Sequence, residues 1–227
     1  MPKTYLVAGA SRGIGFAVAE RLHSEGHRVV SVSRTPSSIG TWIEADLSTR
    51  AGILHIRDTV GSSPLDGLLY MGGTWEDKAF TRDYRFEDCS DEELERVINV
   101  NLLAPIRLTQ VLLPSLHRST NPKIIFMGSL SGRDNYPYRE VANSASKFGL
   151  RGAVHALREE LRPDRIGVTV INPGNVGTQE VLDDLSQGSV VGTSPVPMSD
   201  LLAIIDCVLN ISRDTCVKEI DVPAMGD

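Results

Sequence analysis

The chain has 227 residues, 41% of them hydrophobic, and a formal net charge of -6. This length suits one α/β domain with a large core, and the acidic balance argues against general binding of nucleic acids or anionic membranes. Three scattered cysteines and five unclustered histidines argue against a disulfide framework and a metal site. The sequence shows neither a signal peptide nor an apolar run near the ~20 residues that span a bilayer, so we expect a cytoplasmic protein.

The first element is an apolar run of strand length that ends at Gly9, and a helical pattern follows to about Ser24. A strand, turn and helix in this order offer free N–H groups and the positive end of a helix dipole to a pyrophosphate. Gly13 would let the phosphate approach the backbone, and Gly15 would let helix and strand pack closely. The turn therefore predicts dinucleotide binding by Gly9, Ser11, Arg12, Gly13, Ile14 and Gly15.

The second strand is predicted at Arg28 to Val32 and is followed by Ser33-Arg34. An acidic residue at this strand end would bind the ribose 2′-hydroxyl of NAD, whereas a basic one suits the 2′-phosphate of NADP. Arg12 could reach the same phosphate. The two arginines therefore favour NADP(H) over NAD(H).

Two more predicted strands end in residues suited to a ligand. The third, Trp42 to Ala45, ends at Asp46-Leu47, where Asp46 either accepts a hydrogen bond from the adenine or caps the helix beginning near Thr49. The fourth, Gly67 to Met71, is followed by Gly72-Gly73, which allow a ligand close to the backbone. The aromatic-containing loop 74–90 either walls the site or is a surface insertion.

A long helical pattern starts at Asp91, and we expect Pro105 to kink it. Asn101 lies on its otherwise apolar stretch, so this amide is either structural or part of a site. A fifth strand, Lys123 to Met127, runs into Gly128-Ser129. The next helix, about 142–161, carries Asn143 and Lys147.

A sixth strand, Val168 to Ile171, leads into a segment that includes Pro173, Gly174, Val176 and Thr178. Residues 179–198 are rich in Gly, Ser and Pro and predict a mobile lid over the substrate. A last helix near 199–211 and a strand near 217–220 complete one domain over residues 1–227.

Five features in this order resemble the short-chain dehydrogenase/reductase family over nearly the whole chain. They are the Gly9–Gly15 turn, Asp46-Leu47, Asn101-Leu102, Gly128-Ser129 and the Asn172–Thr178 segment. The resemblance implies a single-domain, doubly wound Rossmann fold with about seven parallel strands and helices on both faces. It also implies a dinucleotide across the strand ends and a homodimer or homotetramer joined through the fourth and fifth helices.

The resemblance further implies hydride transfer between a nicotinamide and a carbonyl or alcohol. Asn101, Ser129 and Lys147 occupy three of the family's four catalytic places. Asn143 stands in the fourth place, where the family has a tyrosine that protonates the carbonyl, and an amide is no general acid near neutrality. The end of the fourth strand also differs from the family's usual sequence, because Tyr70-Met71-Gly72-Gly73 stands where the family has Asn-Asn-Ala-Gly.

Three functions stay open on this basis. The favoured one is a carbonyl reductase whose proton comes from Tyr136, Tyr138 or a water held by Asn143, Asn101 and Lys147. A second is reduction of a conjugated C=C bond, where Ser129 and Asn143 stabilise the enone oxygen. The third is an NADP-binding regulatory or partner subunit without turnover.

Overall fold

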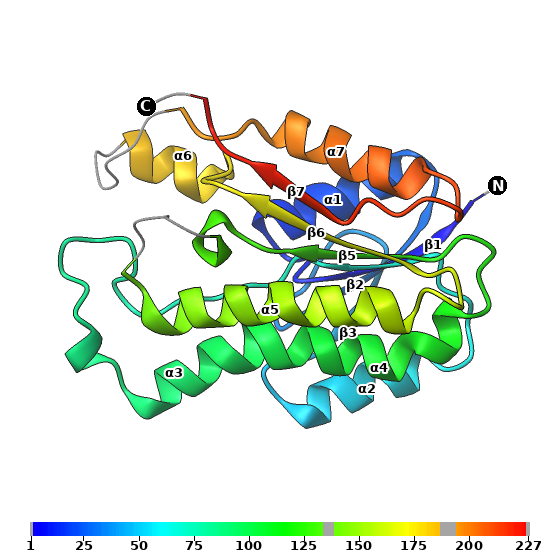
Figure 1. Ribbon diagram of the computed structural model, residues 1–227, viewed down its shortest axis with the longest axis horizontal. Helices are drawn as coiled ribbons and strands as arrows, with labels where there is room; N and C mark the ends of the chain where they lie inside the picture. Colours follow the sequence, from blue (N-terminus) through cyan, green and yellow to red (C-terminus); the bar gives the residue numbers. More distant parts are fainter. Residues whose placement is uncertain (1, 134–138, 187–193, 226–227) are drawn as a thin grey trace.

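The computed structural model describes residues 2–133, 139–186 and 194–225, and its centre is a seven-stranded sheet (Figure 1). The strands run parallel in the order β3-β2-β1-β4-β5-β6-β7. They are β1 (Thr4–Ala8), β2 (Arg28–Ser33), β3 (Thr41–Glu44), β4 (Gly67–Tyr70), β5 (Lys123–Met127), β6 (Gly167–Pro173) and β7 (Glu219–Val222). The expected doubly wound Rossmann sheet is therefore confirmed.

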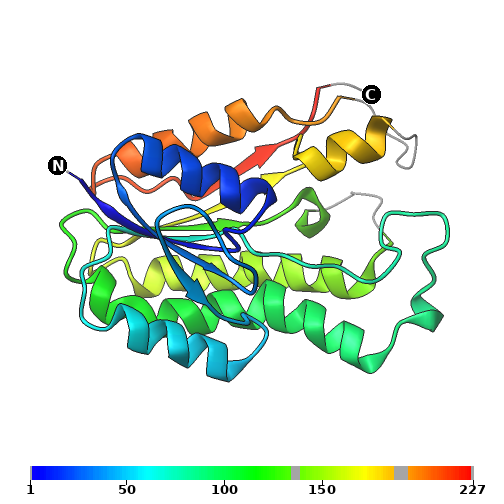
Figure 2. The ribbon, with the colours of Figure 1, turned by 180° about the vertical axis from the view of Figure 1, so that it is seen from behind.

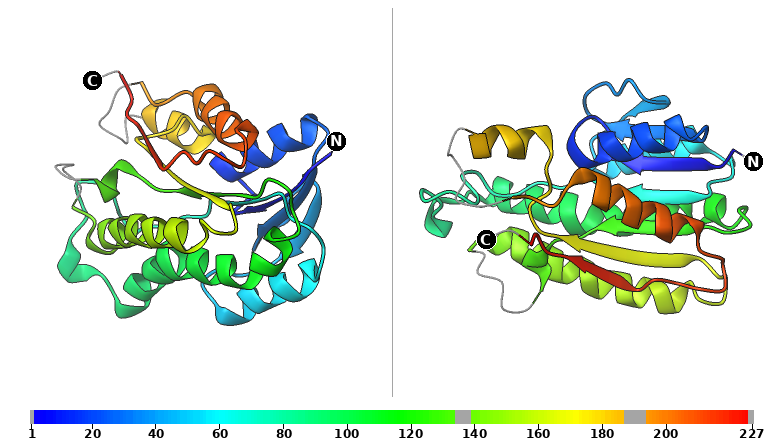
Figure 3. Two further views of the ribbon diagram at one scale, coloured as in Figure 1. Left: turned by 45° about the vertical axis from the view of Figure 1, so that its right-hand side comes forward. Right: turned by 90° about the horizontal axis from the view of Figure 1, so that it is seen from above.

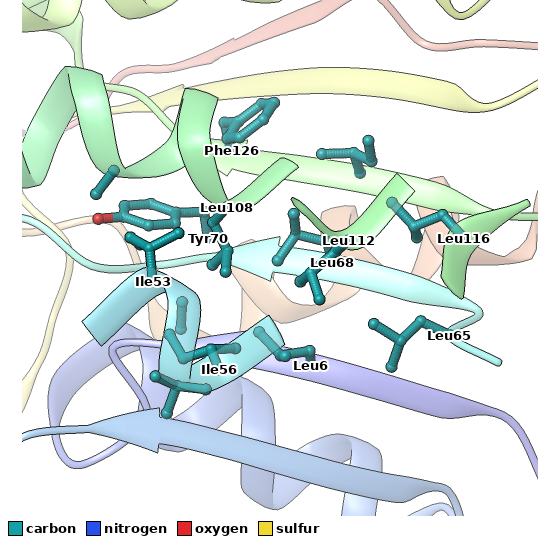
Figure 4. Close-up of a cluster of buried hydrophobic side chains, with 14 of the residues drawn as sticks. Leu6, Ile53, Ile56, Leu65, Leu68, Tyr70, Leu108, Leu112, Leu116 and Phe126 are labelled. Atoms are coloured by element: carbon teal, nitrogen blue, oxygen red, sulfur yellow. The ribbon is translucent and has the colours of Figure 1, made fainter. Parts of the chain in front are cut away.

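Helices cover both faces of the sheet, which is why its central strands are apolar on both sides. The helices are α1 (Gly13–Ser24), α2 (Arg50–Val60), α3 (Asp91–Ile98), α4 (Ala104–Leu116), α5 (Val141–Glu160), α6 (Gln179–Ser186) and α7 (Met198–Asn210). Helices α2, α4 and α5 pack on one face, and α1 and α7 pack on the other (Figure 2). Figure 4 shows side chains of α2 and α4 meeting those of β1, β4 and β5 in the first of these cores.

The run from Asp91 to Leu116 is interrupted by a π-helical turn at Asn99–Leu103, just before Pro105. Pro105 has no N–H and cannot donate the usual helical hydrogen bond to the Asn101 carbonyl, so the helix widens at this point. The Tyr70 hydroxyl donates to the Val100 carbonyl at 2.6 Å, which ties β4 to the turn. The expected kink is thus a π turn that sets the position of Asn101.

By length and composition alone this same helical run, Asp91–Leu116, passes the test for a helix that could cross a membrane, since an 18-residue window within it has a mean hydropathy of 1.3. The sequence-based expectation that no such run exists is therefore wrong by this measure. In the fold, its residues Leu108, Leu112 and Leu116 are buried against the sheet. The run is accordingly a core helix of the Rossmann fold.

Two segments differ from the expectation, one at the carboxyl end of the sheet and one at its amino end. Residues Gln179–Ser186 of the predicted lid form α6, which lies beyond the end of β6 (Figure 3). The last strand begins at Glu219, two residues later than the apolar pattern indicated. Tyr136 and Tyr138, the two candidate proton donors, lie outside the described residues.

Candidate functional site

The glycine turn packs β1 and α1 against the end of β4. Gly9 has a φ of +86°, and a Cβ on it would lie 2.7 Å from the Gly72 Cα. A Cβ on Gly15 would lie 2.1 Å from the Gly9 carbonyl oxygen. Both positions therefore require glycine, and the turn brings the first N–H groups of α1 to the carboxyl edge of the sheet.

The amino terminus of α1 suits an anionic ligand. Its N-cap residue, Arg12, makes no side-chain capping hydrogen bond, and the first turn contains no acidic residue. The N–H groups and the positive end of the dipole are therefore left for a ligand, and a pyrophosphate is the group that fits them. Ser11 and Ile14 lie half-buried in the same turn.

The segment after β6 lies next to the glycine turn. The Thr178 Cγ2 atom lies 3.7 Å from where a Cβ on Gly13 would be, and Glu180 of α6 pairs with Arg12 at 2.9 Å. Val176 forms a bridge with Val196, so the two ends of the segment are joined at its base. Thr178 and the start of α6 are therefore placed beside whatever binds at α1, whereas residues 187–193 of the predicted lid lie outside the described residues.

The end of β2 gives its two predicted cofactor residues different surroundings. The Ser33 hydroxyl donates to the Thr35 carbonyl at 2.7 Å and accepts from the Trp42 Nε1 at 3.1 Å. Ser33 is therefore buried and engaged within the protein. Arg34 is exposed and makes no ion pair with any described residue, which leaves its guanidinium available for a phosphate.

Asp46 does not cap α2, so that alternative for it was wrong. Thr49 is the N-cap, and its hydroxyl accepts from the Gly52 N–H at 3.0 Å. The Asp46 Oδ1 instead accepts from the N–H and hydroxyl of Ser48 at 2.8 and 2.7 Å. This local turn holds the carboxylate at the end of β3, where the adenine was predicted, and the buried Leu47 packs toward Gly72.

Asn101 and Lys147 meet at Gly73. A Cβ on Gly73 would lie 3.8 Å from the Asn101 Oδ1 and 3.9 Å from the Lys147 Nζ. The Asn101 amide also binds the main chain of Thr74 in both directions, accepting from its N–H at 2.9 Å and donating to its carbonyl at 2.7 Å. Asn101 is thus structural and part of the site at once.

Hydrogen bonds through Ser131 link two of the predicted catalytic residues, Asn143 and Ser129, and Asn101 lies next to them. Asn143 Nδ2 donates to Ser131 Oγ at 3.4 Å. Asn101 Nδ2 lies 3.5 Å from Asn143 Oδ1, while its two hydrogens suit the shorter contacts to the Thr74 carbonyl at 2.7 Å and the Ser146 hydroxyl at 3.1 Å. Ser131 then donates to Ser129 Oγ through its hydroxyl at 2.8 Å and its N–H at 3.1 Å. Because Ser129 accepts both bonds, its own proton is free to point at a substrate oxygen.

Lys147 is a cation in an apolar setting. Its Nζ donates to the Met127 carbonyl at 3.1 Å and makes no ion pair with any residue that the structure describes. Desolvation lowers the pKa of this ammonium from 10.5 to about 8. Two of its N–H bonds are left for other acceptors, and the hydroxyls of a ribose fit this requirement.

The sequence did not reveal two buried glutamates that hold the 74–90 loop on α5. Glu76 is fully buried and accepts from the N–H groups of Ala142 and Asn143 at 2.7 and 3.2 Å. Glu140 accepts from the Phe80 N–H at 2.8 Å. The loop therefore walls the site, because it binds the helix end that carries Asn143.

A cavity of about 420 Å³ opens beside Gly73, and the 74–79 loop, Arg12 and Arg96 line it. Trp75 of this loop is half exposed and makes an edge-to-face contact with Phe80, with ring centroids 5.8 Å apart. No cluster of three metal-ligating side chains occurs within residues 2–133, 139–186 and 194–225.

The remaining predicted residues, Pro173 and Gly174, lie at the end of β6. Gly174 donates to the Val222 carbonyl at 3.0 Å. The neighbouring Asn172 donates to Glu219 at 2.8 Å, and a Cβ on Gly128 would lie 2.1 Å from its Oδ1. Through these contacts the loop that carries Ser129 packs closely against β6, which positions Ser129 at the carboxyl end of the sheet.

Comparisons with known proteins agree with this architecture. The family profile described as short chain dehydrogenase matches residues 3–187. The ketoacyl reductase HetN of Nostoc sp. is 30% identical, over 96% of this chain and 79% of that protein. The 3-oxoacyl-[acyl-carrier-protein] reductase MabA of Mycobacterium tuberculosis is 29% identical, over 83% of this chain and 76% of its own.

Solved structures share the fold. A short chain dehydrogenase of Shigella flexneri complexed with NADP aligns with a TM-score of 0.82 at 23% identity, covering 96% of each chain. A 4-hydroxyisoleucine dehydrogenase complexed with NADH aligns with a TM-score of 0.81 at 23% identity, covering 97% of this chain and 96% of that one. At 23% sequence identity, this structural similarity shows a shared fold and nothing further.

Proposed function

The chain belongs to the short-chain dehydrogenase family of oxidoreductases, and we propose that it reduces a small-molecule carbonyl group with NADPH. The observation that carries this proposal is the set of hydrogen bonds by which Ser131 joins Ser129 to Asn143 and leaves the Ser129 proton free. A hydroxyl aimed at an oxygen that gains negative charge stabilises the transition state of carbonyl reduction. A bound nicotinamide would supply the hydride.

Proton delivery is atypical in this proposal, because Asn143 occupies the family's tyrosine position. With a pKa of about 8, the Lys147 ammonium is mostly protonated at neutral pH and acidic enough to act as a general acid. It passes a proton to the new alkoxide, directly or through a water held beside Asn101 and Asn143, and solvent reprotonates the amine. Ser129 holds the oxygen during this transfer.

The similar proteins support a ketone as the acceptor. HetN and MabA are named as reductases of ketoacyl and 3-oxoacyl compounds. The exposed Trp75 and Phe80 provide apolar surface beside the cavity at Gly73, where an acyl chain would lie. We therefore place a ketone with an apolar chain ahead of a conjugated C=C bond, the second acceptor.

This function is tested with purified protein, NADPH and matched ketones, quinones and enones. We expect NADPH consumption and an alcohol product with a 3-oxoacyl thioester. Saturated ketones formed from enones would instead establish C=C reduction. Tight NADPH binding without oxidation in any reaction would establish the alternative, a non-catalytic NADP-binding subunit.

Cofactor choice rests on Arg34 and Arg12 at the end of β2 and in the glycine turn. Because Arg34 is exposed and unpaired within the described chain, Arg34→Asp should remove its attraction for the 2′-phosphate and add repulsion. We expect the Kd for NADPH to rise about 10- to 100-fold, as lost charge-assisted hydrogen bonds of about 1.5–3 kcal/mol imply. Titration with NADPH and NADH checks this, and equal effects on both would contradict it.

The proposal also covers the oligomeric state of the protein and its cellular location. We propose a homodimer or homotetramer through α4 and α5, because Phe148 and Val141 on α5 are 44% and 46% exposed. A monomer mass in light scattering would contradict it. A small-molecule substrate and a cytoplasmic location complete the proposal.

A further inference from the structure

A second cavity, of about 430 Å³, lies at the amino ends of β6 and β7, at the opposite end of the sheet from the glycine turn (Figure 1). Its walls come from the end of α5, the turn before β6 and the connection between α7 and β7. Its cationic lining residues are Arg158, Arg162, Arg165, Arg213 and Lys218. This concentration of positive charge is notable in a chain with a net charge of -6.

Three of these cations lack a carboxylate partner among the described residues. Arg158 is 6% exposed and donates to the carbonyls of Val168 and Lys218, at 3.1 and 2.8 Å. Arg213 donates only to the Asp164 carbonyl at 3.4 Å, and Lys218 makes no ion pair. No ion pair among the described residues neutralises them at the cavity, although Glu159, whose pKa is lowered first by its hydrogen bond with Arg162 and in part by the charges of Lys218 and Arg158, acts on them at longer range.

The carboxylates nearby are fewer than the cations and are already engaged. Asp214 pairs with Arg165 at 3.0 Å, and Glu159 accepts from Arg162 at 2.6 Å. The third, Asp164, contacts His117 at 3.0 Å. Of these three carboxylates, Asp214 lines the cavity together with the five cationic residues, so the lining keeps an excess of positive charge.

The cavity is supported by the fold beneath it. Lys123 of β5 is 2% exposed, and its Nζ donates to the carbonyls of Ser212 and Thr215, at 3.0 and 3.5 Å. This buried ammonium shapes the connection that forms one wall and adds positive charge below the floor. Arg165 has a φ of +53°, a conformation that costs a non-glycine residue energy. The hydrogen bonds of Lys123 and the backbone conformation of Arg165 together keep the cationic side chains around the cavity.

We propose that this cavity binds a small anion carrying a diphosphate group, at a site separate from the cofactor. Guanidinium groups match phosphate oxygens in a forked geometry, and ~430 Å³ lies within the usual range for small-molecule sites. The net charge of -6 argues against a nucleic acid or an anionic membrane as the ligand, and a cavity of this size suits a small molecule.

Cys216 lines the cavity as an exposed free thiol and provides the readout. In a Cys89→Ser/Cys207→Ser protein it is the remaining cysteine of the three. The protein is first saturated with NADPH to occupy the glycine turn. Alkylation by neutral iodoacetamide is then followed by mass spectrometry with increasing pyrophosphate, and with ADP in a parallel series.

We expect pyrophosphate at ten times its Kd to slow alkylation of Cys216 about tenfold, because bound protein is shielded. The added change Arg213→Gln/Lys218→Gln should abolish this protection, whereas Arg12→Gln should keep it. Stronger protection by ADP would identify a nucleotide, and equal protection would identify the diphosphate group alone. Protection equalled by NaCl at the same ionic strength, or retained in Arg213→Gln/Lys218→Gln, would overturn the proposal.

Discussion

Replacing Lys147 by methionine should lower kcat/KM for the ketone by about 10²–10⁴-fold, the usual worth of a general acid. The change removes the ammonium that lies beside Asn101 and Gly73 while keeping an unbranched apolar stem in the half-buried position. Steady-state kinetics with NADPH measure the loss, and circular dichroism confirms that the variant is folded. An unchanged rate would remove Lys147 from the mechanism.

The Lys147→Arg variant separates charge from proton donation. Arginine keeps a positive charge but does not release its proton in proteins. It should therefore retain most NADPH affinity and still lose turnover. If Lys147→Arg kept full turnover, Lys147 would serve only to bind the cofactor.

The pH profile gives an independent check on the same residue. The ammonium is charged below its pKa of about 8 and neutral above it. The kcat/KM for NADPH, which reports the free enzyme, should be level below this pH and fall as the pH rises through it. In Lys147→Arg this fall should disappear.

Replacing Ser129 by alanine should lower kcat by about 10²–10³-fold, the usual cost of losing one donor to a developing oxyanion. Ser129 accepts two hydrogen bonds from Ser131, so the proton of its hydroxyl has no other assigned acceptor among the described residues. Cofactor affinity should be unchanged. A kcat within about twofold of the wild type would contradict the role given to this hydroxyl.

The Ser131→Ala variant tests whether Ser131 orients the Ser129 hydroxyl. In Ser131→Ala the Ser129 hydroxyl loses the shorter of the two hydrogen bonds that orient it and keeps the one from the backbone N–H. We expect kcat to fall about fivefold, the equivalent of a ~1 kcal/mol hydrogen bond. Ser144→Ala is the matched control, because Ser144 lies on α5 next to Asn143 but outside the chain of hydrogen bonds. Equal effects in Ser131→Ala and Ser144→Ala would contradict the proposed orientation.

Local signals in the sequence were sufficient for the framework. The apolar runs at β1, β4 and β5 are buried as predicted, and the five residues of β5 match the expected strand. Glycine at positions 9 and 15 was predictable because backbone contacts there leave no room for a Cβ. Such features depend on neighbours within one strand–turn–helix unit, so a short stretch of sequence carries them.

The resemblance also predicted which polar residues would form the site. Ser129 follows the end of β5 and is joined to Asn143 of α5 through Ser131. Asn101 of the π turn lies next to Asn143, and the Lys147 ammonium lies beside Asn101 at Gly73.

Two details were not predicted. The run from Asp91 contains a π turn before Pro105, which Tyr70 contacts at the Val100 carbonyl, and Asp46 binds Ser48 instead of capping α2.

By itself, the sequence determined the order of the elements and the glycine turn, because both follow from local spacing, and its resemblance to the family supplied the candidate catalytic residues. Only the tertiary structure revealed that Glu76 binds the N–H of Ala142, 66 residues away, and that Ser131 joins Ser129 to Asn143. The distal cationic cavity was equally hidden, since Arg158 and Arg213 become neighbours only when α5 and the chain before β7 pack at one end of the sheet. These contacts depend on side-chain positions in three dimensions, which no local pattern of residues encodes.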